Sequence, residues 1–296
     1  MTVSATPDAR AAFDTLLATL RPKLHRYCAR MVGSVLDGED VLQDALVKAV
    51  EAFTTSPPIT NPEGWLFRIA HNAALDFLRR RARLSATFAD EDPEMVADPA
   101  NTAEARQAAA AGLRTFMGLP VAQRSSVILM DVLGYSLEEI GAVTGITIPA
   151  VKAALHRGRE KLRELASQPE GTPQKVLTAT EQARLRVYID RFNARDFDAV
   201  RDMLADDVRL ELVARLRLNG RREVQNYFHN YDLNPNWRLT PAILEGHPAA
   251  LVDDPVTGRY FVLLQWTPDG LVTIRDFRYA AYALENADVQ VLADPP

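Results

Sequence analysis

The sequence predicts a multidomain protein in which two all-α modules, the second with a helix-turn-helix, precede a C-terminal α+β domain. Three observations lead to this fold class. A chain of 296 residues has room for more than one domain. Apolar residues recur at helical spacing in the first part of the chain but alternate as in strands from Val208 onward. Two proline-containing stretches separate the parts. The predicted boundaries are 10–84 for the first module, 85–110 for an acidic flexible linker, 111–168 for the second module, 169–177 for a second linker and 178–296 for the α+β domain.

Composition and charge narrow the classes of function. Apolar residues make up 47% of the chain, which suffices for packed cores, and no apolar run is long enough to span a membrane. The N-terminus lacks the pattern of a signal peptide, so we expect a cytoplasmic protein without membrane contact. Cys28 is the only cysteine and the five histidines lack metal-ligand spacing, so neither a metal nor a cofactor is expected. A net charge of −5 argues against a protein that holds DNA unaided, because phosphate neutralisation supplies most nonspecific affinity.

The first module opens with helices over residues 11–53, two or three in number, with breaks at Gly33 and Gly38. The last of these helices begins with acidic residues, which the positive end of a helix dipole favours. Its apolar residues, such as Val41 and Ala45, form an inner face. Its outer surface consists of Glu39, Asp40, Gln43, Asp44 and Lys48. Spacing alone favours a solvated face over a contact site.

A further helix is expected over residues 65–83, after a loop rich in Pro and Thr. Its apolar stripe consists of Leu66, Ile69, Ala70, Ala73 and Phe77, and its other side carries Arg68, His71, Asn72 and Arg79. The helix ends in a cluster of four arginines, at positions 79, 80, 81 and 83. Both the helix dipole and a nearby phosphate backbone account for this cluster.

The second module contains the pattern of a helix-turn-helix. Ser136 and Glu139 form a capping box, which begins the first helix of the motif. Gly145 suits the positive φ of a tight turn. Thr147 caps the second helix, which holds Pro149 in its first turn, where a missing N–H costs little.

The second helix of the motif has an inner and an outer face. The inner face repeats at helical spacing and consists of Val151, Leu155, Gly158 and Leu162. The side chains turned outward are Pro149, Lys152, Ala153, His156, Arg157 and Glu160. A basic outward face at a helix N-terminus suits a DNA major groove. The alternative is an ordinary helical hairpin with a solvated charged face.

Three runs, in this order and spacing, resemble the bacterial RNA polymerase sigma factors of the extracytoplasmic-function group. They are EDVLQDALVKA, WLFRIAHNAALDFLRRR, and LPVAQRSSVILMDVLGYSLEEIGAVTGI followed by AVKAALHRGREKL. The resemblance covers residues 10–168. It implies that the first module binds core RNA polymerase and melts the promoter, while the helix-turn-helix reads the upstream promoter element. A polymerase partner would supply the DNA affinity that the net charge argues against.

The resemblance also implies roles for individual residues. Those expected to bind polymerase are Glu39, Asp40, Gln43 and Asp44. Those expected at the melted promoter DNA are Arg68, His71, Asn72, Asp76, Arg79 and Arg80. Those expected to place the helix-turn-helix on DNA are Thr147, Pro149, Lys152, Ala153, His156 and Arg157. One departure is that two alanines, at 153 and 154, follow the lysine where the family often has a polar or basic pair. An outward Ala153 can touch a thymine methyl but cannot donate a hydrogen bond, so we expect a weaker or differently specified contact.

The linker over residues 85–110 is acidic and contains two prolines. Its acidic residues include Glu91, Asp92, Glu94, Asp98 and Glu104, against one arginine, Arg106. Such a stretch does not fold alone. It is either a plain tether or, as the resemblance suggests, an acidic strand that occupies a polymerase channel meant for nucleic acid.

The C-terminal domain begins with helices, expected over 181–192 and 197–204, and then changes period. VRLEL alternates from Val208, and TPAILEG and AALVDD are short apolar runs. RYFVLLQW joins LVTIRDFRY through Pro268, Asp269 and Gly270, which is a strong hairpin signal. This pattern predicts helices packed on an antiparallel sheet.

The runs FNARDFDAVRDMLADDVRLEL, NGRREVQNYF and IRDFRYAAYAL resemble a SnoaL-like domain over residues 178–290. This is the cone-shaped fold shared with polyketide cyclases and nuclear transport factor two. The resemblance implies a regulatory domain that contacts the sigma modules within the same chain. The fold also hosts enzymes, so fold alone does not decide the function.

One carboxylate of this domain is a candidate site residue. Val272, Ile274 and Asp276 share one face of a strand, so Asp276 can point into an apolar concavity. It is either a general base or, as we expect, a carboxylate whose pKa is lowered by Arg275 or Arg278. The residues of a possible ligand pocket are Tyr227, Trp237, Trp266 and Asp276, and the alternative is that these aromatic residues are simply core.

The sequence therefore predicts a bacterial transcription initiation factor and not an enzyme. It would bind core RNA polymerase and direct it to specific promoters, with the C-terminal domain modulating the activity in cis. Two alternatives stay open. A stand-alone DNA-binding regulator with a ligand-sensing domain predicts salt-sensitive binding without polymerase, and a SnoaL-type enzyme fused to a DNA-binding module predicts turnover by the C-terminal domain.

Overall fold

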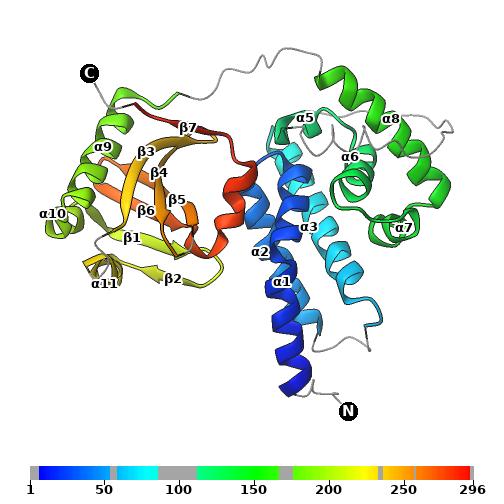
Figure 1. Ribbon diagram of the computed structural model, residues 1–296, viewed down its shortest axis with the longest axis horizontal. Helices are drawn as coiled ribbons and strands as arrows, with labels where there is room; N and C mark the ends of the chain where they lie inside the picture. The colour runs from blue at the N-terminus through cyan, green and yellow to red at the C-terminus, as the bar shows by residue number, and fades with distance from the viewer. Residues whose placement is uncertain are drawn as a thin grey trace. The chain divides into compact units, whose positions relative to one another are not determined.

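The computed structural model describes residues 7–53, 59–85, 112–166, 176–232, 236–256 and 258–293 (Figure 1). The chain divides into two compact units, Met1–Gly171 and Thr172–Pro296, here called the helical unit and the C-terminal unit. Each has its own hydrophobic core, because the buried side chains form one cluster from Phe13 to Leu162 and another from Leu177 to Ile274. The two predicted linkers lie almost wholly outside the described residues.

The first module of the helical unit contains α1 (Pro7–Val32), α2 (Val35–Phe53) and α3 (Pro62–Ser85). The expected break at Gly33 is confirmed, since this residue takes a φ of 83° just after α1 ends. The expected break at Gly38 is wrong. Gly38 lies inside α2, where a Cβ would come within 2.6 Å of the Cα of Ala29. Glycine is therefore needed there because α1 and α2 cross closely.

The second module of the helical unit consists of short helices and one long helix. These are α5 (Leu113–Met117), α6 (Val121–Val127), the π-helical turn η1 (Ile128–Val132), α7 (Leu137–Thr144) and α8 (Ile148–Ala166). The all-α class predicted for both modules is confirmed. In η1 the backbone hydrogen bond reaches five residues back in place of four, since the amide of Leu133 donates to the carbonyl of Ile128 at 3.1 Å.

The C-terminal unit is an α+β domain, as predicted, with a mixed seven-stranded sheet in the order β2-β1-β6-β5-β4-β3-β7. Its helical elements are α9 (Ala179–Asn193), α10 (Phe197–Asp202), α11 (Arg221–Asp232) and the 3-10 helix η2 (Arg278–Asn286). Its strands are β1 (Leu204–Leu212), β2 (Leu216–Asn219), β3 (Arg238–Leu244), β4 (His247–Asp254), β5 (Gly258–Thr267), β6 (Gly270–Asp276) and β7 (Val289–Val291). Only the β1–β6 pair is parallel among the pairs described.

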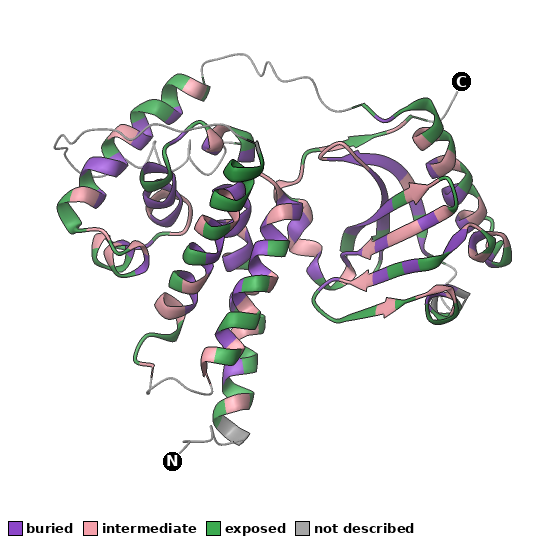
Figure 2. Cartoon of the chain, turned by 180° about the vertical axis from the view of Figure 1, so that it is seen from behind, coloured by how far each residue is buried: buried purple, intermediate pink, exposed green. Residues whose placement is uncertain are grey.

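Helices cover one face of this sheet. α9 packs on β3 and β4, while α11 packs on β1 and β2. Figure 2 shows the buried residues on the inner sides of these helices and along the strands that they cover. On the opposite face η2 packs against β5, where the rings of Phe261 and Phe277 stack with their centroids 4.1 Å apart.

The predicted hairpin between β5 and β6 is confirmed, since Thr267 pairs with Gly270. The expected alternation along β6 is wrong at its start. The register shifts between Gln265 and Trp266, so that Trp266 pairs with Leu271 and Gln265 with Thr273. This bulge puts Leu271, and not Val272, on the buried face that also carries Ile274 and Asp276.

Candidate functional site

The helix-turn-helix is built by the local signals that the sequence contains. Ser136 and Glu139 form a reciprocal capping box at the start of α7. Gly145 ends that helix with a φ of 79°, the left-handed conformation that the turn requires. The hydroxyl of Thr147 accepts from the amide of Ala150 at 3.4 Å, and Pro149 lies in the first turn of α8. The predicted motif is thus confirmed as a structure.

The inner face of α8 is the one predicted. Val151, Leu155 and Leu162 are buried in the core of the helical unit. Gly158 lies so close to α6 that a Cβ there would come within 2.8 Å of Cγ2 of Val127. This close approach holds the long helix against the module.

The outer face of α8 differs from the prediction at one position. Thr147, Pro149, Lys152 and His156 are exposed, and Arg157 is half-buried. The expectation that Ala153 faces outward is wrong, because its side chain is only 6% exposed. α8 contacts α5 and α6 as well as α7, so more of its circumference is covered than a two-helix motif implies.

A buried ion pair behind α8 is missing from the sequence prediction. Nε and Nη2 of Arg159 donate to the two carboxylate oxygens of Asp131 at 2.9 and 2.6 Å. The side chains are 9% and 2% exposed. The sequence does carry a signal for it, because Asp131 interrupts the apolar run ILMDVL, where a carboxylate requires a partner.

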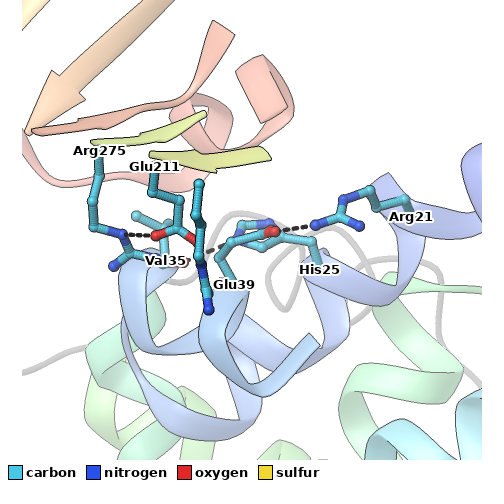
Figure 3. Close-up of polar contacts among 7 residues, drawn as sticks. Arg21, His25, Val35, Glu39, Glu211 and Arg275 are labelled. Carbon is cyan, nitrogen blue, oxygen red and sulfur yellow. Dashed lines mark hydrogen bonds and ion pairs between the residues drawn. The ribbon is translucent and has the colours of Figure 1, made fainter. Parts of the chain in front are cut away.

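The predicted polymerase-binding row lies on α2. Asp40 and Asp44 are exposed and Gln43 is half-buried. The expectation that Glu39 belongs to this outer surface is wrong, because Glu39 is fully buried and pairs with Arg21 of α1 (Figure 3). Since α2 begins at Val35, Glu39 falls on the same stripe as the buried Val35 and Leu42.

A histidine hydrogen bond stands beside this ion pair at the α1–α2 junction. Nε2 of His25 and the carbonyl oxygen of Val35 are 3.0 Å apart (Figure 3). Burial lowers the pKa of His25, so the neutral imidazole is the favoured form and acts as the donor. The start of α2 is therefore held by polar contacts as well as by apolar packing.

The predicted DNA-facing row lies on α3. Arg68, Asn72, Asp76, Arg79 and Arg80 are exposed. The side chains at 68, 72, 76 and 79 follow one another at helical spacing and therefore share a face.

His71 does not belong to that row, so its expected outward position is wrong. Its side chain is 5% exposed, and its Nδ1 lies 2.7 Å from the hydroxyl of Tyr27. Burial, together with the charge of Arg79, lowers the pKa of His71 to about 4. The cause is its place four residues after the buried Phe67, which puts it on the inner stripe of α3.

Acids of α2 and arginines of α3 are paired across the module surface. Arg80 and Asp44 are 3.6 Å apart, and Arg81 and Asp37 are 3.4 Å apart. In the same surface Arg79 and Lys48 approach Asp76. These side chains are between 38% and 65% exposed, so each pair contributes little to stability and gives way readily to a binding partner.

The two modules of the helical unit contact each other through polar anchors. A carboxylate oxygen of Glu63 in α3 accepts from the hydroxyl of Tyr135 and from Nζ of Lys23, both at 2.6 Å. Arg124 in α6 is 5% exposed and donates to the carbonyl of Met31 at 2.5 Å. Burial lowers the pKa of Arg124 to about 10. The contact therefore holds a buried cation whose hydrogen bonds, among the described residues, go to backbone carbonyls and to the sulfur of Met117.

In the C-terminal unit, Asp276 lies at the centre of a buried hydrogen-bond cluster. Its Oδ2 accepts from the hydroxyls of Tyr227 at 2.7 Å and Tyr231 at 3.1 Å. Its Oδ1 accepts from the amide of Arg278 at 2.8 Å. The hydroxyl of Tyr260 is buried nearby.

The expected neutralisation of Asp276 by an arginine is wrong. Arg275 donates to Glu211 at 2.8 Å, and the guanidinium of Arg278 pairs with Asp254 at 3.2 Å (Figure 3 for the former). Burial therefore raises the pKa of Asp276, although the tyrosine and backbone hydrogen bonds oppose this shift. The direction of this pKa shift is the opposite of our expectation.

The aromatic residues of the predicted pocket are only partly brought together. Trp237 contacts Tyr231 edge-on at 4.7 Å and lies 4.4 Å beneath the guanidinium of Arg278. Trp266 contacts Tyr188 instead, at 6.5 Å. A surface pocket of this unit is lined by other residues, namely Asn236, Asp253, Asp254, Pro255, Gly258 and Arg259. Tyr227 and Asp276 are therefore part of a buried cluster and not of that pocket.

Within the described ranges, no group of His, Cys, Asp or Glu side chains has the arrangement of a metal site. None of the helices in these ranges combines the length and apolar character that crossing a membrane requires.

Comparison with protein families matches two regions of the chain. Residues 16–84 match the model of Sigma-70 region 2, and residues 113–162 match the model of Sigma-70, region 4. The ECF RNA polymerase sigma factor SigE of Mycolicibacterium smegmatis is 34% identical over 57% of this chain and 68% of its own length. The RNA polymerase sigma factor CarQ of Myxococcus xanthus is 35% identical over 55% of this chain and 93% of its own.

Solved structures are similar over further parts of the chain. The extracytoplasmic function sigma factor SigJ of Mycobacterium tuberculosis is 18% identical, covers 88% of this chain and 95% of its own, and has a TM-score of 0.35. An NTF2-like protein of unknown function from Cytophaga hutchinsonii is 16% identical, covers 32% of this chain and 96% of its own, and has a TM-score of 0.25.

Proposed function

The chain belongs to the ECF sigma factors, which direct RNA polymerase to promoters, and we propose that its C-terminal unit modulates this activity in cis. Sigma factors bind core RNA polymerase and promoter DNA and are not enzymes. The observation that carries the assignment of contacts is the exposure of three polar rows, on α2, α3 and α8, in the two matched regions. Run-off transcription by core polymerase with the full chain tests it.

The row on α2 is the proposed polymerase contact, formed by Asp40, Gln43 and Asp44. Its support is that the opposite side of the helix is buried while Asp40 and Asp44 are exposed. Changing Asp40 and Asp44 together to Lys should weaken association with core polymerase while circular dichroism stays unchanged. Asp14→Lys, at an exposed acid of α1, is the matched control. Equal association of both variants would remove this surface from the proposal.

The rows on α3 and α8 are the proposed promoter contacts. Arg68, Asn72, Asp76, Arg79 and Arg80 would lie along the melted strand. Thr147, Pro149, Lys152, His156 and Arg157 would place α8 in the major groove. These assignments are supported by the exposure of the α3 row and of the start of α8.

Lys152 is the sharpest test of the α8 row, because it is exposed in the second turn of the helix. If Lys152 binds a base edge, Lys152→Ala should cost about 1–3 kcal/mol at one promoter position. If it binds phosphate, the variant should weaken all promoters alike. A promoter scan with no loss on any sequence would contradict both roles.

Modulation in cis by the C-terminal unit is supported by the charged face that its sheet presents. Glu211 of β1 accepts from Arg275 of β6 and from Arg217 of β2, each at 2.8 Å. A tether of few residues would keep such a face at high effective concentration near the helical unit. Truncation after Gln168 retains the whole core of the helical unit and should alter the initiation rate while polymerase association persists. An unchanged rate would refute modulation.

A second candidate function, small-molecule sensing by the C-terminal unit, is favoured by the cluster around Asp276. The carboxyl of Asp276 and the hydroxyls of Tyr227 and Tyr231 form a buried polar cluster in an apolar interior, a combination that can bind the polar group of a small molecule. A thermal-shift screen of the full chain against flat neutral carbonyl compounds tests it. Binding should stabilise the wild type and not Asp276→Asn, and a screen without any stabilising compound would count against sensing.

A further inference from the structure

We propose that Asp131 and Arg159 form a positioning pair that sets the rotational orientation of α8, and thereby decides which promoter bases this chain prefers. The inference rests on the proposed function of α8 as the promoter-reading helix. Neither residue touches DNA in this proposal. Both act through the side chains at the start of α8.

The pair is directional and enclosed. Two nitrogens of the planar guanidinium donate to two oxygens of one carboxylate, at 2.9 and 2.6 Å. Such a fork-to-fork contact fixes an angle as well as a distance, which a single-point contact does not. With 9% and 2% of the side chains exposed, little water competes for these hydrogen bonds. The apolar packing of Val151 and Leu155 holds α8 in place but is not directional.

The pair lies on the same helical stripe as the reading face. Arg159 follows Lys152 by seven residues, so the two side chains leave the helix axis only about 20° apart. The N-terminal half of that stripe is exposed and carries Lys152, whereas the C-terminal half is buried and carries Arg159. Because both side chains belong to one helix, fixing the direction in which Arg159 leaves the helix axis also fixes the direction of Lys152.

Small rotations of α8 have large consequences for base contacts. With a helix radius of about 5–6 Å, a roll of 20° moves the outer surface by about 2 Å. Hydrogen bonds have a distance range of about 0.5 Å, so such a movement breaks or exchanges a base contact. The orientation of α8 is thus a determinant of specificity and not only of stability.

The acidic partner is itself held in an unusual turn. Asp131 belongs to η1, the π-helical turn in which the amide of Leu133 reaches back to the carbonyl of Ile128. Single π-helical turns occur often at functional sites. Gly158, which directly precedes Arg159, lies so close to α6 that a Cβ there would come within 2.8 Å of Cγ2 of Val127, so the pair acts next to a point where the two helices touch.

A purely structural role for this pair predicts a different result from a positioning role. Buried ion pairs are weak contributors to stability compared with apolar substitutes, and their best-attested use is to specify one arrangement among several. A structural pair would, when broken, lower transcription from all promoters in the same proportion. A positioning pair would change the ratio between promoters.

The experiment uses polymerase reconstituted with the full chain and a promoter library randomised in the upstream element. Asp131→Asn and Arg159→Lys each keep much of the side-chain volume but destroy the two-point contact. For each, the preference for the best base at the position read by Lys152 should fall by about tenfold, the worth of one base contact. The exposed Lys161 and Glu164 pair lies on the same helix, so Glu164→Gln is the matched control and should keep the wild-type profile.

Two further variants separate the outcomes. Adding Lys152→Ala to Asp131→Asn should change the profile no further, because the contact is already lost. The reversed pair, Asp131→Arg with Arg159→Asp, should recover part of the preference. Thermal melts restrict the comparison to variants that fold. A profile that only scales uniformly would overturn the positioning role, and a wild type without promoter-dependent transcription would overturn the proposed function itself.

Discussion

Two buried aspartates, one in each unit, are satisfied by opposite means. Asp131 of the helical unit gives both carboxylate oxygens to the guanidinium of Arg159. Asp276 of the C-terminal unit is 1% exposed and accepts from two phenol hydroxyls and one backbone amide. The first arrangement pairs the carboxylate with a cation, whereas in the second burial raises the pKa of the carboxyl.

The difference shows what each unit is organised to do. In the helical unit a buried charge pair holds one helix whose exposed start carries the candidate contacts, so the ion pair and the candidate contacts lie at opposite ends of one stripe of α8. In the C-terminal unit the polar groups converge on the interior, where a buried cluster of Asp276 and tyrosines suits a ligand or a proton-sharing network better than a surface contact.

The largest effect is expected from breaking the ion pair of the helical unit. Arg159→Leu would leave the carboxylate of Asp131 buried without its partner, and the free energy of unfolding of this unit should fall by about 3–5 kcal/mol. Hydrogen exchange of the α8 peptides in the full chain measures it. Arg163→Leu, on the exposed side of the same helix, is the control and should change little. If both variants lost the same free energy of unfolding, the burial of Asp131 would not require its ion pair with Arg159.

A smaller loss is expected when Asp276 loses one of its donors. Tyr227→Phe removes the hydroxyl at 2.7 Å but leaves Tyr231 and the amide of Arg278, so we expect a cost of about 1–2 kcal/mol. The cost should appear in hydrogen exchange of α11 and not of α8. Tyr279→Phe is the control, since that tyrosine is 41% exposed. A loss as large as that of Arg159→Leu would erase the contrast between the two aspartates.

Much of the helical unit could be predicted from the sequence because its signals are local. The capping box of Ser136 and Glu139 and the turn at Gly145 each depend on residues within a few positions of one another. The sequence prediction misplaces three residues, Glu39, His71 and Ala153. For Glu39 and His71 it omitted the buried Val35 and Phe67, which lie on the same stripes of α2 and α3. For Ala153 the contacts of α8 with α5 and α6 decide, and periodicity within one helix does not contain that information.

The cluster around Asp276 could not be predicted in the same way because its partners are distant in sequence. Tyr227 and Tyr231 are 49 and 45 residues away, while the arginines that flank Asp276 in sequence turn to other carboxylates. The bulge at Gln265 and Trp266 also shifts the strand alternation. The arginine pairing of Asp131 was equally out of reach, since Arg159 follows 28 residues later.

The pH dependence of stability should distinguish the wild type from Asp276→Asn. In the unfolded chain the carboxyl of Asp276 has its ordinary pKa of 3.8, and in the folded chain its pKa is higher. Between these values the unfolded chain holds fewer protons, so the stability of the C-terminal unit falls as pH rises, by at most about 1.4 kcal/mol per pH unit. Asp276→Asn should remove this fall above pH 3.8. If stability depended on pH in the same way in both proteins, the pKa of Asp276 would not be raised in the folded chain.

The smallest effect on stability is expected at the surface ion pairs. Relative to that small effect, the effect on transcription should be largest there. Arg80 and Asp44 are 3.6 Å apart, and their side chains are 59% and 58% exposed. Arg80→Gln should therefore change the free energy of unfolding by less than about 0.5 kcal/mol. If Arg80 binds promoter DNA, the same variant should lower run-off transcription and reduce its salt dependence, because one phosphate contact is lost. Arg10→Gln, which breaks a comparably exposed pair with Asp14 on α1, should do neither. If Arg80→Gln changes transcription but not stability, the exposed pair acts in the opposite way to the buried pair of Asp131. If Arg80→Gln instead lowers stability and leaves the salt dependence unchanged, Arg80 belongs with the structural ion pairs.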